Sequence, residues 1–357
     1  MLRKFRWDQI GFGALGLLLV LLLSYQSIAV DEIGSDDDRF TARNLGVVVN
    51  EKDPLSVQIG EYYQTQRNIP AENMIFVEFE PSQEVFSQQE FSALRRHIYS
   101  QSSNEIQGYA LTWAAPYRVD CMSITSAIAL GFDEKYCATG CKPTAPSPYF
   151  NGDGARPYED YGIRPTMMLA ATNFQEAKAL IDRGMKADET YPTQTGYLLQ
   201  TSDANRSRRA EKFALIQLLF ESRFRIEFLQ QDAIINRDDV MFYFTGLPSI
   251  PNLDTLDFLP GAIADHLTSF GGQLTKGKSG QMSSLRWLEA GATGSYGAVV
   301  EPCNFNEKFP EPGLVIDTYI SGATLMESYW KSVLWPGQGV FIGEPLARPF
   351  GSKDAQK

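Results

Sequence analysis

The sequence contains little of the chemistry on which most enzymes depend. Only two of its 357 residues are histidines, and four are cysteines. It has no Gly-x-Ser-x-Gly elbow to carry a nucleophilic serine. Its glycine-rich turn at 291–297 leads from a predicted helix to a predicted strand, whereas dinucleotide and Walker motifs lead from a strand to a helix. We therefore expect no nucleotide cofactor.

Basic residues are also in the minority. Lysine and arginine together number 32, against 43 aspartates and glutamates, and the net charge is −11. Nucleic acids and anionic lipid surfaces are bound by clusters of lysine and arginine. The acidic balance argues against both as partners of the folded body.

The first 29 residues have the composition of a signal peptide. Three basic residues precede an apolar run over 10–23, and Ser27 and Ala29 are small residues at the positions that a signal peptidase reads. The alternative is an uncleaved anchor, because residues 10–30 are just long enough to span a bilayer. In either case the protein is exported, to the periplasm or the medium, and would contact a membrane only through this segment.

The cysteines are few and even in number. In an exported protein, four cysteines predict two disulfides, and three pairings are possible. Their spacing, with one Cys-x3-Cys and two distant cysteines, matches no standard zinc site, so no metal is expected. The residues concerned are Cys121, Cys137, Cys141 and Cys303.

Strands and helices alternate along the rest of the chain, which predicts a doubly wound α/β fold with a mostly parallel sheet. We expect an acidic linker over 30–43, a first α/β subdomain over 44–190 and a second over 191–350. Periodicity is absent from 114–165, a loop that the cysteines would staple. Strands are expected near 45–50, 74–79, 108–113, 166–171, 196–201, 224–229, 240–244, 261–267 and 297–300, with a final strand that runs into a turn over 339–345. Helices are expected near 54–63, 87–99, 174–185, 204–221, 281–290 and 317–334.

Polar residues and glycines follow two of these strands, 240–244 and 261–267. If the two strands are parallel neighbours, their ends emerge together at the carboxyl edge of the sheet, where open α/β sheets bind ligands. A third strand, 297–300, ends in a carboxylate that could reach the same edge. The candidate residues are Thr245, Gly246, Asp265, His266, Thr268, Ser269, Gly271, Gly272 and Glu301.

His266 is the better placed of the two histidines for catalysis. A hydrolase would use Ser269 as nucleophile, His266 as base, Asp265 or Asp254 to orient the imidazole, and the amides of 271–272 as oxyanion donors. The competing interpretation is that His266 is a hydrogen-bonded structural residue and that its neighbours cap a turn.

Several segments resemble an uncharacterised family of exported bacterial proteins. The resemblance covers nearly the whole mature chain, and it implies export and a shared fold but no established activity. The segments are VVVN (47–50) with DPLS (53–56), YQTQRNIP (63–70), PGAIADHLTSFGG (260–272), GATGSYGAVVEPC (291–303) and GEPLARPF (343–350).

A more distant resemblance is to the gingipain-type cysteine peptidases, which have the caspase-like fold. In that family one strand ends in Gly-His-Gly, the next ends at the nucleophilic cysteine, and Gly-Asp-Pro lies near the end of the domain. Residues 244–246, 266–269 and 343–345 fall at the matching places. Thr245 replaces the histidine, and Thr268 and Ser269 stand where the cysteine should be, so the resemblance implies a fold and a site location without the cysteine mechanism.

These observations predict an exported, disulfide-containing α/β protein with a caspase-like sheet and two candidate functions. The first is a hydrolase-derived protein, a degenerate peptidase, whose carboxyl-edge cleft binds a peptide or another extracytoplasmic ligand. The second is a non-catalytic cell-envelope protein that serves binding or assembly.

Overall fold

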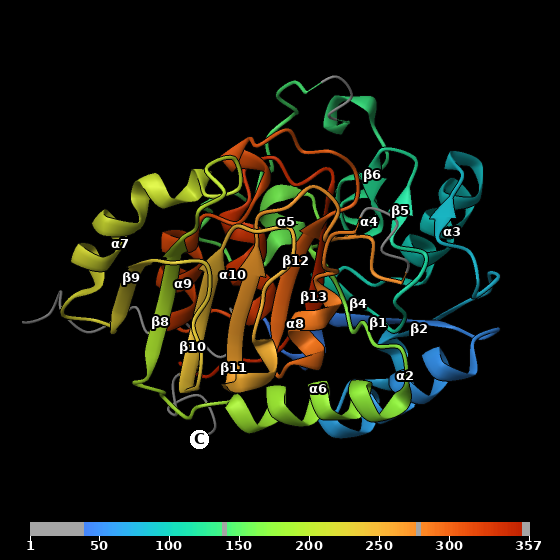
Figure 1. The fold of residues 1–357 in the computed structure, drawn as a ribbon. Helices are drawn as coiled ribbons and strands as arrows, with labels where there is room; N and C mark the ends of the chain where they lie inside the picture. The colour runs from blue at the N-terminus through green and yellow to red at the C-terminus, as the bar shows by residue number, and fades with distance from the viewer. Residues whose placement is uncertain (1–38, 138–140, 276–279, 352–357) are drawn as a thin grey trace, which may run out of the picture. The chain divides into compact units, whose positions relative to one another are not determined.

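The computed structural model describes residues 39–137, 141–275 and 280–351 (Figure 1). The predicted signal peptide over 1–29 lies outside the described residues, as does most of the predicted linker over 30–43. Within the described ranges, no helix has the length and apolar character needed to cross a membrane.

A ten-stranded sheet runs through the body in the order β2-β1-β4-β7-β13-β12-β11-β10-β8-β9 (Figure 1). Its neighbours pair in parallel from β2 to β7 and from β12 to β9, while β12 and β13 are antiparallel. The predicted α/β fold with a mostly parallel sheet is confirmed. The strands are β1 (Leu45–Asn50), β2 (Met74–Val77), β4 (Gly108–Leu111), β7 (Thr166–Met168), β8 (Thr195–Gln200), β9 (Ile226–Gln230), β10 (Arg237–Thr245), β11 (Leu256–His266), β12 (Gly294–Ala298) and β13 (Gly339–Gly343).

The sheet contains the same strand order twice. The first four long strands of the chain lie in the order β2-β1-β4-β7, and the next four lie in the order β9-β8-β10-β11. In each set the second strand is outermost, followed by the first, third and fourth. The last strand, β13, lies between β7 and β12, so strands from 44–190 and from 191–350 belong to one continuous sheet.

Helices flank this sheet, and the first two begin with side-chain caps. Asp53 caps the first with its carboxylate, and Pro54 occupies its first position, where no amide donor is needed. Ser87 and Glu90 form a capping box on the second. The helices are α2 (Pro54–Arg67), α3 (Gln88–Gln101), α4 (Ile124–Leu130), α5 (Pro157–Tyr161), α6 (Phe174–Ala187), α7 (Phe213–Phe220), α8 (Leu285–Glu289), α9 (Pro312–Ile320) and α10 (Leu325–Ser332).

Helices α2 and α6 lie side by side along the lower edge of the view in Figure 1. The ring of Tyr62 in α2 meets Phe174 of α6 edge to face, and its hydroxyl donates a hydrogen bond to Asp182 at 2.5 Å. Because α6 also packs on β11, this pair of helices connects the two sets of strands.

Two predicted helices are divided in the structure. The segment predicted as one helix over 317–334 forms α9 and α10, because Gly322 between them has φ +97° and Thr324 starts a new capping box with Glu327. The segment 204–221 contains a 3-10 turn, Arg208–Lys212, before α7 begins.

The segment 114–165 has more regular structure than its sequence predicts. It contains α4, α5 and the short strands β5 (Arg118–Val119) and β6 (Met122–Ser123), which form a small sheet with β3 (Val85–Phe86). These elements are two to seven residues long, too short for periodicity to reveal.

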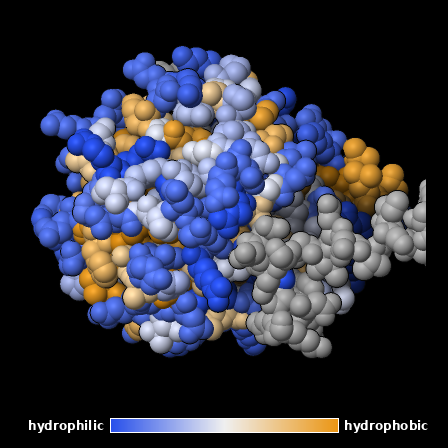
Figure 2. Space-filling view, turned by 180° about the vertical axis from the view of Figure 1, so that it is seen from behind, coloured by the Kyte–Doolittle hydropathy of each residue, from blue (hydrophilic) through white to orange (hydrophobic). Residues whose placement is uncertain are grey.

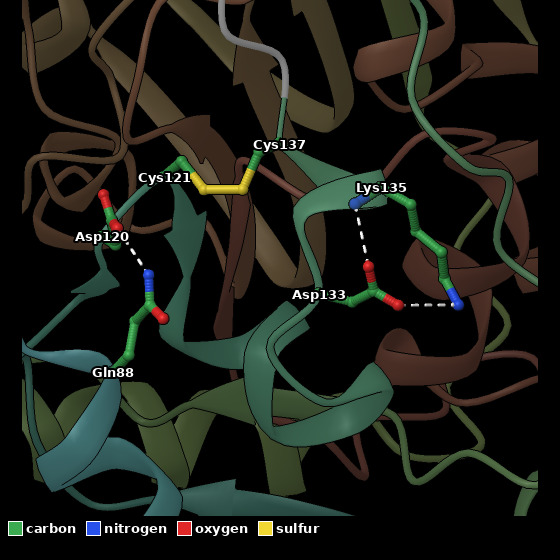
Figure 3. Close-up of a disulfide and its surroundings, with 6 residues drawn as sticks. All are labelled: Gln88, Asp120, Cys121, Asp133, Lys135 and Cys137. Atoms are coloured by element: carbon green, nitrogen blue, oxygen red, sulfur yellow. Dashed lines mark hydrogen bonds and ion pairs between the residues drawn. A yellow bond between two sulfur atoms is a disulfide. The ribbon is translucent and has the colours of Figure 1, made fainter.

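The two predicted disulfides are present. Cys121 pairs with Cys137 beside β6 (Figure 3), and Cys141 pairs with Cys303 in the turn after β12. Their presence is consistent with an exported protein.

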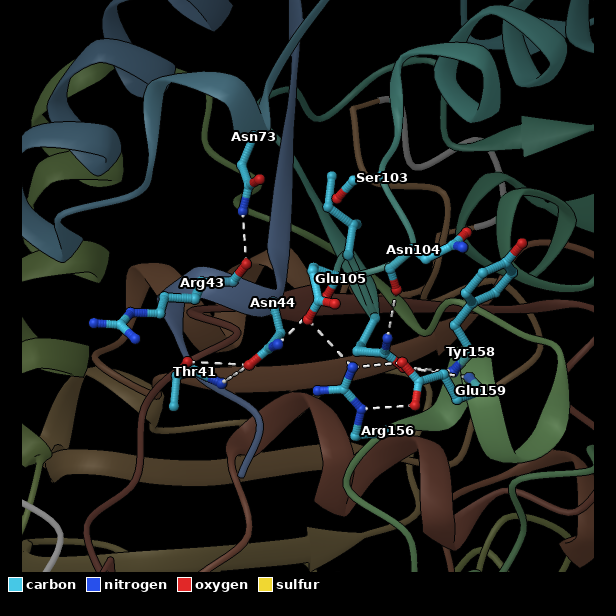
Figure 4. Close-up of polar contacts among 12 residues, drawn as sticks. Thr41, Arg43, Asn44, Asn73, Ser103, Asn104, Glu105, Arg156, Tyr158 and Glu159 are labelled. Carbon is cyan, nitrogen blue, oxygen red and sulfur yellow. Dashed lines mark hydrogen bonds and ion pairs between the residues drawn. The ribbon is translucent and has the colours of Figure 1, made fainter. Parts of the chain in front are cut away.

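Hydrogen bonds connect the start of the described chain to segments that lie elsewhere in the sequence (Figure 4). Asn73 donates to the carbonyl of Arg43 at 2.9 Å, and Asn44 donates to the carbonyl of Glu105 at 3.3 Å. Arg156 forms an ion pair with Glu105 at 3.2 Å. The chain is therefore already part of the folded body from about residue 41 onward.

Candidate functional site

Strands β10 and β11 end together, as the sequence predicts. They are parallel, and Thr245 at the end of β10 is the register partner of His266 at the end of β11. Gly246 follows in a crowded turn, where a Cβ atom would lie 1.9 Å from the carbonyl oxygen of Arg206. Only glycine fits there, so the turn after β10 packs directly on the loop after β8.

Asp265 and His266 lie on opposite faces of the sheet. Consecutive side chains of a strand alternate between faces, and β11 includes both residues. Ile263 and Leu267 belong to the hydrophobic cluster on one face, and Ala264 belongs to the cluster on the other. The structure therefore does not bring the Asp265 carboxylate to the imidazole that it was expected to orient.

Asp265 forms an ion pair with Arg209 instead. The Arg209 guanidinium lies 2.7 Å from Asp265 Oδ1 and also donates to the carbonyls of Thr245 at 2.9 Å and Pro310 at 3.2 Å. Burial raises the pKa of the Asp265 carboxyl, and the positive charge of Arg209 opposes that shift. Both side chains are buried, so this pair connects the end of β11 to the turn before α7.

His266 uses both of its ring nitrogens inside the fold. Trp287 of α8 donates its indole N–H to Nδ1 at 2.9 Å, which places the imidazole proton on Nε2. Nε2 lies 3.2 Å from the carbonyl oxygen of Met282 and donates to it. Burial lowers the pKa of His266 to about 3, so the ring is neutral and has no lone pair free to accept a proton from a serine.

The hydroxyl of Thr268 is also hydrogen-bonded within the fold. It donates a hydrogen bond to the side-chain oxygen of Gln281 at 2.5 Å and accepts one from Arg206 at 3.2 Å. Ser269 is half-buried, and its hydroxyl makes no hydrogen bond among the residues that the structure describes. The contacts of His266 therefore leave Ser269 without a paired base.

The two glycines after this turn serve close packing. The amide of Gly272 donates to the carbonyl of Ala298 at 2.8 Å, and a Cβ on Gly272 would lie 2.4 Å from the carbonyl oxygen of Gly297. The Gly271 carbonyl accepts from the amide of Ser284 at 2.7 Å. The Gly272 amide, expected as an oxyanion donor, is thus occupied by the neighbouring strand.

Glu301 is exposed beyond the end of β12. Its carboxylate accepts a hydrogen bond from the amide of Cys303 at 2.8 Å, next to the disulfide to Cys141. This contact orders the turn that carries the disulfide.

A hollow of about 590 Å³ lies beside these strand ends. One wall is the loop after β10 and the other is the segment that leads into α8, and the amide of Met282 ties them together by donating to the carbonyl of Pro248 at 2.7 Å. His266 and Thr268 hold this second wall through Met282 and Gln281. The lining residues are Ser249, Ile250, Asn252, Leu253, Asp254, Gly280, Gln281, Met282 and Arg286.

Of this lining, only Asp254 was singled out from the sequence, as a carboxylate that could orient His266. The segment 249–254 belongs to no predicted element, and 281–290 was predicted as one helix, whereas α8 begins only at Leu285. Nothing in the sequence shows that 249–254 and 280–286 face each other. The one available signal is positional, because both loops follow strands whose ends were predicted to meet. Among the described residues, no group of three or more histidine, cysteine or acidic side chains is placed to hold a metal ion.

Searches for related proteins found no matching family model, no matching curated protein and no matching solved structure.

Proposed function

We propose that this chain is an exported, non-catalytic binding protein whose ligand occupies the hollow beside the ends of β10 and β11. The observation that carries the proposal is the hydrogen bonding of His266, whose two nitrogens are committed to Trp287 and Met282. The residue that a hydrolase would use as a base here fixes a wall of the hollow. A histidine with this structural role fits descent from a caspase-like hydrolase whose catalytic site became a binding site.

The lining of the hollow suits a short peptide. Its volume, about 590 Å³, lies within the usual range for ligand sites. Ile250, Leu253 and Met282 supply apolar surface, and Asp254 and Arg286 supply charges of both signs. A peptide offers apolar side chains together with polar backbone groups, which these residues would complement.

Binding is tested with peptides selected from a random library on the wild-type protein. Asp254→Lys should weaken their affinity at least tenfold, because it reverses a charge in the hollow. Asp257→Lys is the matched control, since Asp257 is exposed and lies outside the lining. Equal affinity in the two variants would show that the peptides bind elsewhere and would remove the hollow from the proposal.

Catalysis is tested with a fluorophosphonate probe that labels activated serines. The proposal expects no labelling of the wild-type protein. Labelling that disappears in Ser269→Ala would overturn it and would restore the hydrolase interpretation with Ser269 as nucleophile.

A further inference from the structure

Helix α7 presents an apolar face to solvent. Phe213, Ile216 and Phe220 point into the core, while the opposite side carries Leu215, Leu218 and Leu219, which are 56%, 65% and 63% exposed. Figure 2 shows this apolar patch projecting at the right of the molecule. A helix that is apolar on all sides is normally covered on all sides, so this face calls for a partner.

The neighbouring sheet edge is partly covered by α7. The outermost strand, β9, could add a strand from another chain through its free backbone groups. However, the Gln217 side chain of α7 accepts a hydrogen bond from the Phe228 amide of β9 at 3.0 Å. A groove of about 1030 Å³ runs beside the helix, and Leu218 lines it as well as the apolar face. Contact through the helix is therefore favoured over pairing through the strand.

The apolar face is bordered by opposite charges at its two ends. Lys212 directly precedes α7 and Glu221 directly follows it, and both side chains are exposed. Neither has an ion pair with any other described residue. Together with Leu215 and Leu218 they form a row in which each residue is three positions from the next, one of the ridges by which helices pack.

We propose that this row pairs with the same row of a second copy of the chain, related by a two-fold axis. Reversing the row places Lys212 against Glu221 of the partner copy and Leu215 against Leu218, and the symmetry repeats each contact. Because such a row runs obliquely along a helix, the two copies of α7 would cross steeply. This interface lies apart from the hollow near His266 and does not depend on the function proposed for it.

Charge is what favours a second copy over a membrane surface. A helix that lies on a bilayer carries lysine and arginine along the border of its apolar face. Here Lys212 lies at one end of the face, next to Glu211, and Glu221 lies at the other end, in a chain with a net charge of −11. A row that is basic at one end and acidic at the other complements its own reversed copy.

The test is sedimentation equilibrium of the chain without its predicted signal peptide, residues 30–357. The wild type is compared with variants in which the charge of Lys212 or Glu221 is reversed. The wild type should dimerise, and Lys212→Glu and Glu221→Lys should each weaken dimerisation at least tenfold, because each places like charges together at two symmetric contacts. An equimolar mixture of the two variants should dimerise at least as well as the wild type, because every contact in the mixed dimer joins opposite charges. Leu218→Asp should be monomeric, whereas Ile235→Asp should remain dimeric.

Ile235 is the matched control because it is 56% exposed and follows Ile234, which packs in the cluster away from α7. All the substituted side chains are exposed, so thermal unfolding should be nearly unchanged. A wild type that stays monomeric at high concentration would overturn the proposal, as would single charge variants that dimerise like the wild type. Cosedimentation of a monomeric wild type with anionic vesicles, abolished by Leu218→Asp, would assign the face to a membrane instead.

Discussion

His266 bridges three parts of the structure: its own strand, helix α8 and the wall of the hollow. Trp287 holds one ring nitrogen and the Met282 carbonyl holds the other. The Trp287 contact requires the neutral ring, because a protonated Nδ1 could not accept from the indole, whereas Nε2 donates to the Met282 carbonyl in either protonation state. Protonation of His266 therefore breaks a hydrogen bond in the interior as well as placing a charge there.

His266 should make the protein less stable in mild acid. Its pKa is about 3 in the folded protein and about 6.5 when unfolded. Below pH 6.5 the unfolded chain binds a proton that the folded chain does not, so the free energy of unfolding falls by about 1.4 kcal/mol per pH unit down to about pH 3. Between pH 7 and pH 5, His266 should account for a loss of about 2 kcal/mol.

Urea unfolding at pH 7 and pH 5 measures this loss in the wild type and in His266→Gln. The variant starts less stable but should lose about 2 kcal/mol less over the interval. His97→Gln is the control, since His97 is exposed on α3. A pH dependence in His266→Gln that matches the wild type would show that His266 titrates normally in the folded protein.

At the scale of elements, the strand ends were predictable and the directions of their side chains were only partly so. Thr245 and His266 emerge together because β10 and β11 are parallel neighbours. Their ends could be predicted because the apolar runs 240–244 and 261–267 are each followed by polar residues. Alternation along β11 sends Asp265 and His266 to opposite faces, a rule that could have separated them from the start. Their partners, Arg209 and Trp287, lie 56 and 21 residues away in the chain, and no local pattern indicates such contacts.

Removing one partner of the Arg209–Asp265 pair should lower the free energy of unfolding strongly, whereas replacing both with apolar side chains should lower it little. Arg209→Met leaves a buried carboxylate without its cation and two backbone carbonyls without a donor. It should lower the free energy of unfolding by about 3–5 kcal/mol. Arg209→Met combined with Asp265→Leu should recover most of the loss, because no charge is then left unpaired.

Denaturant unfolding of the wild type, the two single variants and the double variant forms a complete mutant cycle. If the two single losses simply add in the double variant, the side chains act independently and the ion pair has no special role. Arg208→Met serves as the control because Arg208 adjoins Arg209 in the same 3-10 turn but lies outside the buried set.

At the scale of the molecule, the segment that follows the last strand is bound to helix α2. Glu344, which follows β13, accepts a hydrogen bond from Tyr63 of α2 at 2.5 Å and forms an ion pair with Arg67. A Cβ on Gly184 of α6 would lie 2.6 Å from the Glu344 side chain, so that helix must present glycine there. The segment 343–345 thus joins two helices to the central sheet.

The two disulfides constrain the chain over very different lengths. Cys121 and Cys137 are 16 residues apart, whereas Cys141 and Cys303 are 162 apart and join the loop that follows α4 to the end of β12. In the chain-entropy model, a cross-link stabilises by restricting the unfolded chain, and the effect grows with the logarithm of the loop length. Removing Cys141–Cys303 should therefore cost about 2 kcal/mol more than removing Cys121–Cys137.

Paired serine substitutions test this difference, because replacing both cysteines of a bond leaves no free thiol. Guanidinium unfolding of Cys141→Ser/Cys303→Ser should give the lower midpoint, and Cys121→Ser/Cys137→Ser should lie between it and the wild type. The reverse order would mean that local packing outweighs the restriction of the unfolded chain. The short bond would then stabilise chiefly by holding β6 and the 3-10 turn at Glu134–Tyr136 in place (Figure 3).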